Sequence, residues 1–223
     1  MSSNAINADV FVYTGEGGLE APRDMVRVMV DPSVTLIPAC AFDARKKLAE
    51  VELCEGVVEI GEWSFANCDR SITKINIPNS LRRIKDFSFA LSLRTTIHLN
   101  DGIESIGDYA FAVCIFTNFR VPPLITVIPW RLLIDSRSIF SIELPENVVE
   151  IRNAALRYCH CLRNVALPPN TILGDDIFIT EAELQTDLTD LQRLFGNSNA
   201  RIIFALQHRF DRLPIHKLVY YQS

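Results

Sequence analysis

Hydrophobic positions recur along this chain at a nearly constant interval. Two inward-facing apolar residues flank one outward-facing residue in a V-x-L-like pattern that occurs seven times. The first residues of these pairs are Val28, Val51, Ile75, Ile97, Phe119, Ile142 and Val165. The steps between them are 23, 24, 22, 22, 23 and 23 residues. A fixed interval of this size indicates a repeat protein, in which each unit buries its apolar face against its neighbours.

Two further apolar columns keep the same phase. The first consists of Ile37, Ile60, Ile84, Ile106, Ile128, Ile151 and Leu173. The second follows five residues later and consists of Phe42, Phe65, Phe89, Phe111, Leu133, Leu156 and Phe178. Three columns in phase predict that all of these side chains share one stacked interior.

Each repeat also predicts its own local structure. The alternating V-x-L pattern predicts a short strand with two side chains inside and one outside. A proline follows the strand directly in four repeats and helps to end it, because proline cannot donate to the next strand. The small residue before the phenylalanine column, as in Ser64-Phe65 and Ala110-Phe111, predicts one helical turn over the interior. The predicted fold is therefore an α/β solenoid: a curved stack of about seven units of 22–24 residues, with short parallel strands on the concave face and short helical turns on the convex face.

The two ends of the chain depart from the repeat. We expect residues 1–25 to form an N-terminal cap, with Val10–Tyr13 as a strand on the first repeat, and residues 26–180 to form the solenoid. Residues 181–223 predict an irregular C-terminal cap with a strand at Leu188–Phe195 and a short amphipathic helix at Ile202–Phe210. The chain stops without an obvious polar cap, which predicts either further repeats after residue 223 or packing against another element.

The repeat pattern resembles that of a known family. The unit Ile97–Asn118, with Ile106-Gly107-Asp108-Tyr109-Ala110-Phe111 and then Cys114, resembles the BspA-type leucine-rich repeat. The resemblance covers about residues 26–180, and the repeats around Leu133 and Leu156 depart from it by replacing phenylalanine with leucine. It implies a leucine-rich-repeat solenoid and a function in adhesion or protein binding. A separate short run, Leu213–His216, resembles the start of an ankyrin-like segment.

Composition and charge narrow the classes of function. The net charge of −5 argues against a nucleic-acid partner, because binding to the phosphate backbone needs a positive field. No apolar run reaches the roughly 20 residues that cross a bilayer, so we expect no membrane span. The first 25 residues lack the pattern of a secretory signal, which predicts a cytoplasmic protein if the N-terminus is native.

Six cysteines raise the question of a metal site or disulfides. Cys159-His160-Cys161 spaces its thiols by one residue, whereas structural zinc sites usually space them by two to four and need four ligands. Cys68, Cys114 and Cys159 each follow the phenylalanine column by three residues, two repeats apart, or roughly 10 Å on the strand side. Disulfides need Cα atoms within about 7 Å. We therefore expect buried free thiols, no metal and no cofactor.

Two surfaces are candidates for recognition. The first, which we call the strand ribbon, consists of the outward residues of the V-x-L strands and the column just before them. Its candidate partner-binding residues are Glu50, Glu52, Lys74, Asn76, His98, Arg120 and Glu143. The second, which we call the aromatic ladder, consists of Trp63, Phe87 and Tyr109, each two residues before the phenylalanine column. The ladder either shields the interior between turns or offers an exposed patch that anchors a partner.

These features favour a non-catalytic scaffold that recognises a protein partner through the concave strand face. The alternative is a cell-surface adhesion or glycan-binding module of a larger protein, which would require export. Catalysis at His98 is disfavoured because the outward residues one repeat away are Asn76 and Arg120, which supply neither a nucleophile nor a carboxylate. The sequence predicts no catalytic residues.

Overall fold

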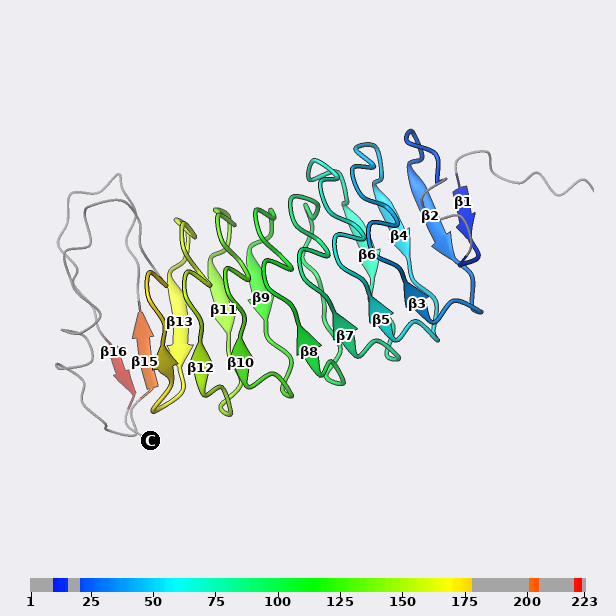
Figure 1. Ribbon diagram of the computed structural model, residues 1–223. Helices are drawn as coiled ribbons and strands as arrows, with labels where there is room; N and C mark the ends of the chain where they lie inside the picture. The colour runs from blue at the N-terminus through cyan, green and yellow to red at the C-terminus, as the bar shows by residue number, and fades with distance from the viewer. Residues whose placement is uncertain (1–9, 16–20, 178–200, 205–218, 222–223) are drawn as a thin grey trace, which may run out of the picture.

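The chain winds into a solenoid whose coils stack side by side in one direction (Figure 1). The computed structural model describes residues 10–15, 21–177, 201–204 and 219–221. Two rows of short strands run along the stack, one above the other in the view of Figure 1. One row holds the V-x-L strands and the other holds the isoleucine column, so the periodicity of the sequence corresponds directly to the coils.

The first row contains the cap strand β1 and the V-x-L strands. They are β1 (Val10–Tyr13), β2 (Arg27–Val30), β4 (Glu50–Glu52), β6 (Lys74–Asn76), β9 (Asn118–Arg120), β11 (Ser141–Glu143) and β13 (Asn164–Leu167). Successive strands pair in parallel and in register within β1-β2-β4-β6 and within β9-β11-β13. The parallel strands are confirmed in six of the seven repeats, and so is the cap strand at Val10–Tyr13.

The second row was not predicted as strand. It contains β3 (Leu36–Ile37), β5 (Glu59–Ile60), β7 (Arg83–Ile84), β8 (Ser105–Ile106), β10 (Val127–Ile128), β12 (Glu150–Ile151) and β14 (Ile172–Leu173). These strands also pair in parallel, as β3-β5-β7-β8 and as β10-β12-β14. Each has two residues, one outward and one inward, which is too short for an alternating pattern to be visible in the sequence.

The predicted helical turns are wrong. The segment that carries the phenylalanine column is a run of hydrogen-bonded turns, and it contains no helix in the part of the chain that the structure describes. In the coil of Phe42, the N–H groups of Cys40, Phe42 and Ala44 donate to carbonyls of the next coil over 2.7–2.9 Å. The intervening N–H groups of Ala41 and Asp43 donate within the turn. Bonds between coils replace the i→i−4 bonds that a helix needs.

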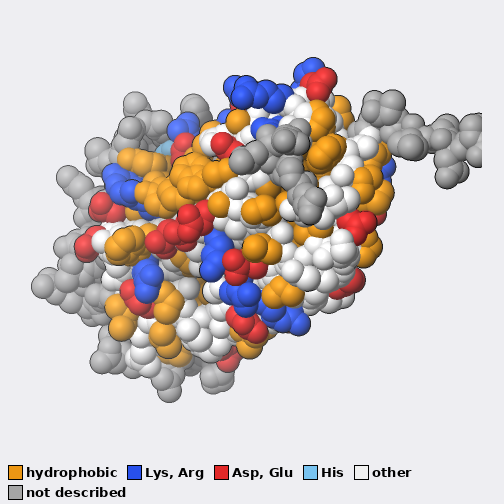
Figure 2. Space-filling view, turned by 45° about the vertical axis from the view of Figure 1, so that its right-hand side comes forward, with side chains coloured by type: hydrophobic (Ala, Val, Ile, Leu, Met, Phe, Trp, Pro, Cys, Tyr) orange, Lys and Arg blue, Asp and Glu red, His pale blue; other side chains and the backbone are white. Residues whose placement is uncertain are grey.

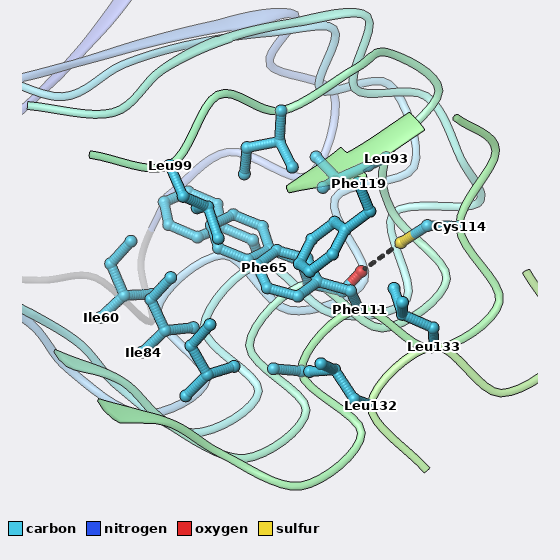
Figure 3. Close-up of a cluster of buried hydrophobic side chains, with 14 of the residues drawn as sticks. Ile60, Phe65, Ile84, Leu93, Leu99, Phe111, Cys114, Phe119, Leu132 and Leu133 are labelled. Atoms are coloured by element: carbon cyan, nitrogen blue, oxygen red, sulfur yellow. Dashed lines mark hydrogen bonds between the residues drawn. The ribbon is translucent and has the colours of Figure 1, made fainter. Parts of the chain in front are cut away.

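The interior confirms the three predicted columns. Phe42, Phe65, Phe89 and Phe111 are fully buried and stack in sequence, with ring centroids 5.0, 5.4 and 5.5 Å apart. The isoleucines of the second row and the inward residues of the first row pack against these rings (Figure 3). Phe178, the last member of the column, lies outside the described residues.

A buried column of serines and cysteines connects the coils. Cys68, Ser92, Cys114, Ser136 and Cys159 each follow the phenylalanine column by three residues. The side chain of each donates to the backbone carbonyl of the column residue in the previous coil, as from Ser136 to Phe111 over 3.1 Å. The two serine hydroxyls also accept a backbone N–H from the coil before, from Cys68 and Cys114. Small hydrogen-bonding side chains therefore satisfy buried backbone groups at this column.

Strands also occur beyond the repeats. Strand β15 (Arg201–Phe204) pairs antiparallel with β13, and β16 (Val219–Tyr221) pairs antiparallel with β15. The predicted helix at Ile202–Phe210 is therefore wrong at residues 202–204, where pairing with the open edge of β13 forms a strand instead. The predicted strand at Leu188–Phe195, the ankyrin-like run at Leu213–His216 and the boundary at residue 180 lie outside the described residues.

Candidate functional site

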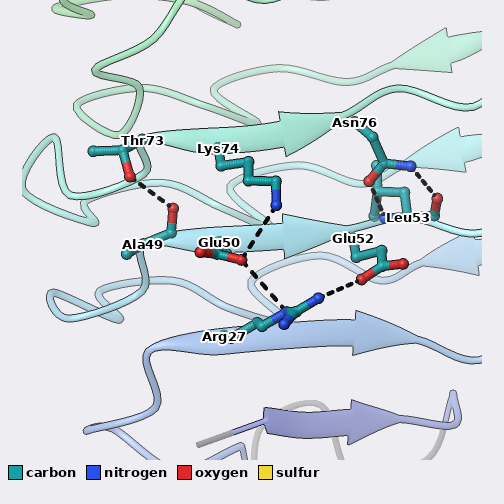
Figure 4. Close-up of polar contacts among 8 residues, drawn as sticks. All are labelled: Arg27, Ala49, Glu50, Glu52, Leu53, Thr73, Lys74 and Asn76. Atoms are coloured by element: carbon teal, nitrogen blue, oxygen red, sulfur yellow. Dashed lines mark hydrogen bonds and ion pairs between the residues drawn. The ribbon is translucent and has the colours of Figure 1, made fainter.

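The strand ribbon begins with a network of ion pairs across three strands (Figure 4). Arg27 on β2 lies 3.5 Å from Glu50 and 3.0 Å from Glu52 on β4, and Lys74 on β6 lies 3.7 Å from Glu50. These side chains are brought together because Arg27, Glu50 and Lys74 occupy the same position of the in-register strands. The side chains are between about one third and three quarters exposed, so each pair stabilises the fold weakly. A partner would meet charges that already neutralise one another in part.

The exposed side chain of Asn76 forms two hydrogen bonds with the backbone of the neighbouring coil. Its side-chain amide donates to the Leu53 carbonyl over 2.6 Å, and its side-chain oxygen accepts the Leu53 N–H over 2.8 Å (Figure 4). The two bonds replace a backbone ladder step between coils at the end of β4. Although exposed, the Asn76 side chain therefore has a fixed orientation and little freedom to turn toward a partner.

The ribbon is interrupted at His98. Ile97 and Leu99 are buried and His98 is exposed, as predicted, but residues 97–99 form no strand. In the preceding coil, two residues separate Ile72 from Ile75. In the coil of His98, three residues separate the equivalent Leu93 and Ile97. Ile72 and Leu93 are bridged in parallel, so the extra residue displaces the strand that should follow, as in a β-bulge. His98 projects from a break between the sheets that end at β6 and begin at β9.

The ribbon continues with a different set of contacts beyond the break. Arg120 on β9 pairs with Asp101 over 2.6 Å, and this hydrogen bond together with the charge of Asp101 raises the pKa of Arg120. The Ser141 hydroxyl donates to the Asn118 side-chain oxygen over 2.6 Å. Glu143 on β11 is exposed and aligned in register with Arg120. The register thus brings Glu50, Glu52, Lys74 and Asn76 together on one side of the break, and Arg120 and Glu143 on the other.

The aromatic ladder forms as predicted. The rings of Trp63 and Phe87 stack with centroids 4.0 Å apart and an interplanar angle of 7°, and those of Phe87 and Tyr109 stack at 4.4 Å and 15°. Trp63 is 36% exposed, whereas Phe87 and Tyr109 are half-buried. At the next position, the Arg131 guanidinium lies 5.4 Å from the centroid of Tyr109 and donates to its hydroxyl. Sequence reasoning missed Arg131 as the fourth member of this stack.

The ladder residues have a costly backbone conformation. Trp63, Phe87 and Tyr109 each have φ of 56°, in the left-handed region that favours glycine and asparagine. The same position is left-handed in every described coil, from Cys40 to Asp176, so the coil shape imposes it. Stacking of the rings offsets part of a cost of about 1–3 kcal/mol per residue.

A groove lies on the second row between β8 and β10. At the other junctions between coils of this row, the N–H after the isoleucine donates to the isoleucine carbonyl of the previous coil, as from Gly107 to Ile84 over 2.8 Å. Pro129 has no N–H, so β8 and β10 do not pair and a groove of about 360 Å³ opens between them. The carboxylates of Asp86, Glu104 and Asp108 line it together with the guanidinium of Arg152. Nevertheless, no group of three or more potential metal ligands occurs within the described residues.

The buried thiols are poor candidates for chemistry. Burial raises the pKa of Cys68 and Cys114 to about 11 and that of Cys159 to about 12. A nucleophile or metal ligand needs the thiolate, which these surroundings disfavour. None of the six cysteines forms a disulfide, and Cys40 is exposed.

These pKa shifts predict a loss of stability at alkaline pH. An exposed thiol in the unfolded chain ionises near pH 8.5, well before the buried thiols do, so the free energy of unfolding falls as pH rises from about 8.5 toward 11. We expect each buried thiol to contribute roughly 2 kcal/mol to this fall between pH 7 and 10. Urea denaturation of Cys114→Ala at both pH values should show a smaller fall than the parent protein, whereas Cys40→Ala should show the same fall. An equal fall in Cys114→Ala and the parent would contradict the prediction.

Comparisons with known proteins agree with this architecture. The family profile described as BspA type Leucine rich repeat region matches six copies, over residues 24–132 and 92–192. A leucine-rich repeat protein from Bacteroides ovatus ATCC 8483 is 26% identical with a TM-score of 0.66, covering 74% of this chain and 43% of that one. The T. pallidum leucine rich repeat protein is 20% identical with a TM-score of 0.69, covering 84% and 87%. This chain thus spans less than half of the B. ovatus protein. Among curated proteins, none matches.

Proposed function

Because the chain belongs to the family of BspA type leucine-rich repeat proteins, we propose that it is a non-catalytic scaffold that binds a protein partner through the strand ribbon. Proteins of repeat folds commonly use an extended face of stacked units for binding. The observation that carries the proposal is the parallel register of β2, β4 and β6 and of β9 and β11. It aligns exposed charged side chains at intervals of about 4.8 Å on a rigid support.

The pattern of charge on the ribbon favours a partner with a mixed surface. Hydrophobic, acidic and basic side chains are interspersed on the side of the molecule shown in Figure 2. On the ribbon, Glu52 and Glu143 lie in different sheets, and Arg120 is in register with Glu143. Charges that are exposed and paired in this way add little affinity but discriminate strongly between partners, since a like charge opposite any of them is unfavourable. No helix in the described part of the chain is long and apolar enough to span a membrane.

Reversing the charges of the ribbon tests this proposal. We expect the combination of Glu52→Lys, Arg120→Glu and Glu143→Lys to weaken partner binding at least tenfold, because each reversal places a like charge against a complementary surface. Partners are first identified by crosslinking and mass spectrometry, and affinities are then measured by calorimetry with the purified partner. Circular dichroism and thermal unfolding verify that the variant is folded.

The second row supplies a matched control. Glu59→Lys, Arg83→Glu and Glu150→Lys together change the net charge by the same amount and lie on the outward positions of β5, β7 and β12. Glu59 and Arg83 form an ion pair over 2.6 Å, which the double reversal preserves. We expect this control to bind like the parent protein. Equal loss in both variants would show that net charge decides binding, and no loss in either would remove the ribbon from the interface.

A further inference from the structure

The two ends of the aromatic ladder differ. The stack of Trp63, Phe87 and Tyr109 is closed at one end by the Arg131 guanidinium, which lies over the Tyr109 ring. At the other end, the equivalent position of the preceding coil holds Cys40, which has no ring and is exposed. The ladder therefore has a cation over its last ring at one end and stops at a bare indole at the other.

The outer face of Trp63 is accessible. Phe87 covers one face of the indole at 4.0 Å and is nearly parallel to it, so the other face points along the stack toward the coil of Cys40. The Cys40 side chain, with one carbon and one sulfur, is too small to cover an indole. Accordingly, Trp63 is 36% exposed. Indole is the aromatic side chain that attracts cations most strongly through its face.

The residue that precedes Trp63 is acidic. Glu62 directly precedes Trp63 and is exposed, and it has no ion pair within the described residues. Because Glu62 is the neighbour of Trp63 in the sequence, its carboxylate is a candidate counter-charge for a cation over the indole. The planar guanidinium of arginine fits both features, since it stacks on an aromatic face and pairs with a carboxylate.

We propose that the open face of Trp63 binds an arginine side chain of a partner protein, in the same way that Arg131 caps the opposite end of the ladder. Trp63 supplies the aromatic face and Glu62 the compensating charge. The site is independent of the strand ribbon, because it lies on the turns that carry the phenylalanine column and not on the strands. The backbone already accepts an arginine at the equivalent position, because Arg131 has φ of 52° where Cys40 has 58°.

The indole N–H of Trp63 reports on this site directly. The chain has two tryptophans, so Trp130→Phe leaves a single indole signal in the ¹⁵N-correlated spectrum of the full chain. The probe is the capped tripeptide Gly-Arg-Gly, compared with Gly-Lys-Gly, Gly-Gln-Gly and Gly-Phe-Gly. We expect a saturable shift with the arginine peptide, about threefold or more tighter than with the lysine peptide, and none with the glutamine peptide. An equal response to the glutamine peptide, tighter binding of the phenylalanine peptide, or no saturable shift would overturn the proposal.

Three variants separate the proposal from general surface effects. Cys40→Arg places a guanidinium over Trp63 from within the chain and should abolish the response to the arginine peptide, whereas Cys40→Ser should keep it. Glu62→Gln should weaken the arginine peptide about two- to fivefold. The response should persist when Glu52, Arg120 and Glu143 are reversed in charge, so a failure here is distinguishable from a failure of the ribbon. A response that survives Cys40→Arg would place the peptide elsewhere and refute the assignment.

Discussion

Replacing Phe111 by alanine is expected to lower the free energy of unfolding by about 3–5 kcal/mol. The ring is fully buried between neighbouring coils, with its centroid 5.5 Å from that of Phe89 and 5.2 Å from that of Phe119 (Figure 3). Truncation removes the contacts on both sides and leaves a cavity in a narrow interior. Because a solenoid is stabilised by contacts between adjacent repeats, the coils before and after Phe111 should both weaken.

Urea denaturation measures the loss, and hydrogen exchange locates it. Exchange should accelerate first at the Phe89 and Phe111 amides, whose N–H groups donate to Ala110 and Leu132 in the following coils. The matched control is Phe140→Ala, since Phe140 is 49% exposed and should change stability by no more than about 0.5 kcal/mol. Similar losses in the two variants would mean that the phenylalanine column does not form the interior.

The sequence contained the information for the coil but not for its hydrogen bonds. The spacing of Phe65, Phe89 and Phe111 reports which side chains are buried together, and the structure confirms this for each of them. The same spacing fits a helical turn and a non-helical turn equally well. Whether the N–H of Phe65 bonds within its turn or to Ser88 of the next coil depends on the approach of that coil, which a local pattern does not encode. For this reason the predicted helices were wrong while the predicted interior was right.

The breaks in both rows did have visible signals. The extra residue between Leu93 and Ile97 and the proline at position 129 can both be read from the aligned repeats, in which only the first coil, with Pro38, shares that proline. The pairing of Arg27 with Glu52 could not be read in the same way. The register places these residues on adjacent strands, but the choice among their rotamers depends on neighbours in three dimensions. The columns of the candidate surfaces were thus predictable, and their contacts were not.

The second large effect is expected at Gly107, where a single methyl group should cost about 3 kcal/mol of stability. A Cβ atom at this position would lie 2.3 Å from the Asp86 side-chain oxygen and 2.4 Å from the Asp86 backbone nitrogen. The backbone of the preceding coil cannot move away without loss, because the Gly107 N–H donates to Ile84 over 2.8 Å and the Asp108 N–H donates to that same Asp86 oxygen over 2.8 Å. Close approach of two coils therefore requires glycine here.

The measurement is urea denaturation of Gly107→Ala beside Gly102→Ala in the same coil. At Gly102, the nearest atoms to an added Cβ belong to the flexible end of the Arg82 side chain, with Nη1 at 2.7 Å, and moving this end costs at most its hydrogen bonds to the Asn79 and Leu81 carbonyls. We expect Gly102→Ala to lose less than about 1 kcal/mol, so the difference between the variants isolates the backbone clash. If Gly107→Ala were as stable as Gly102→Ala, residues 84–86 and 106–108 could move apart without a loss of stability. The close contact of the two coils at Asp86 would then not be the reason for glycine at position 107.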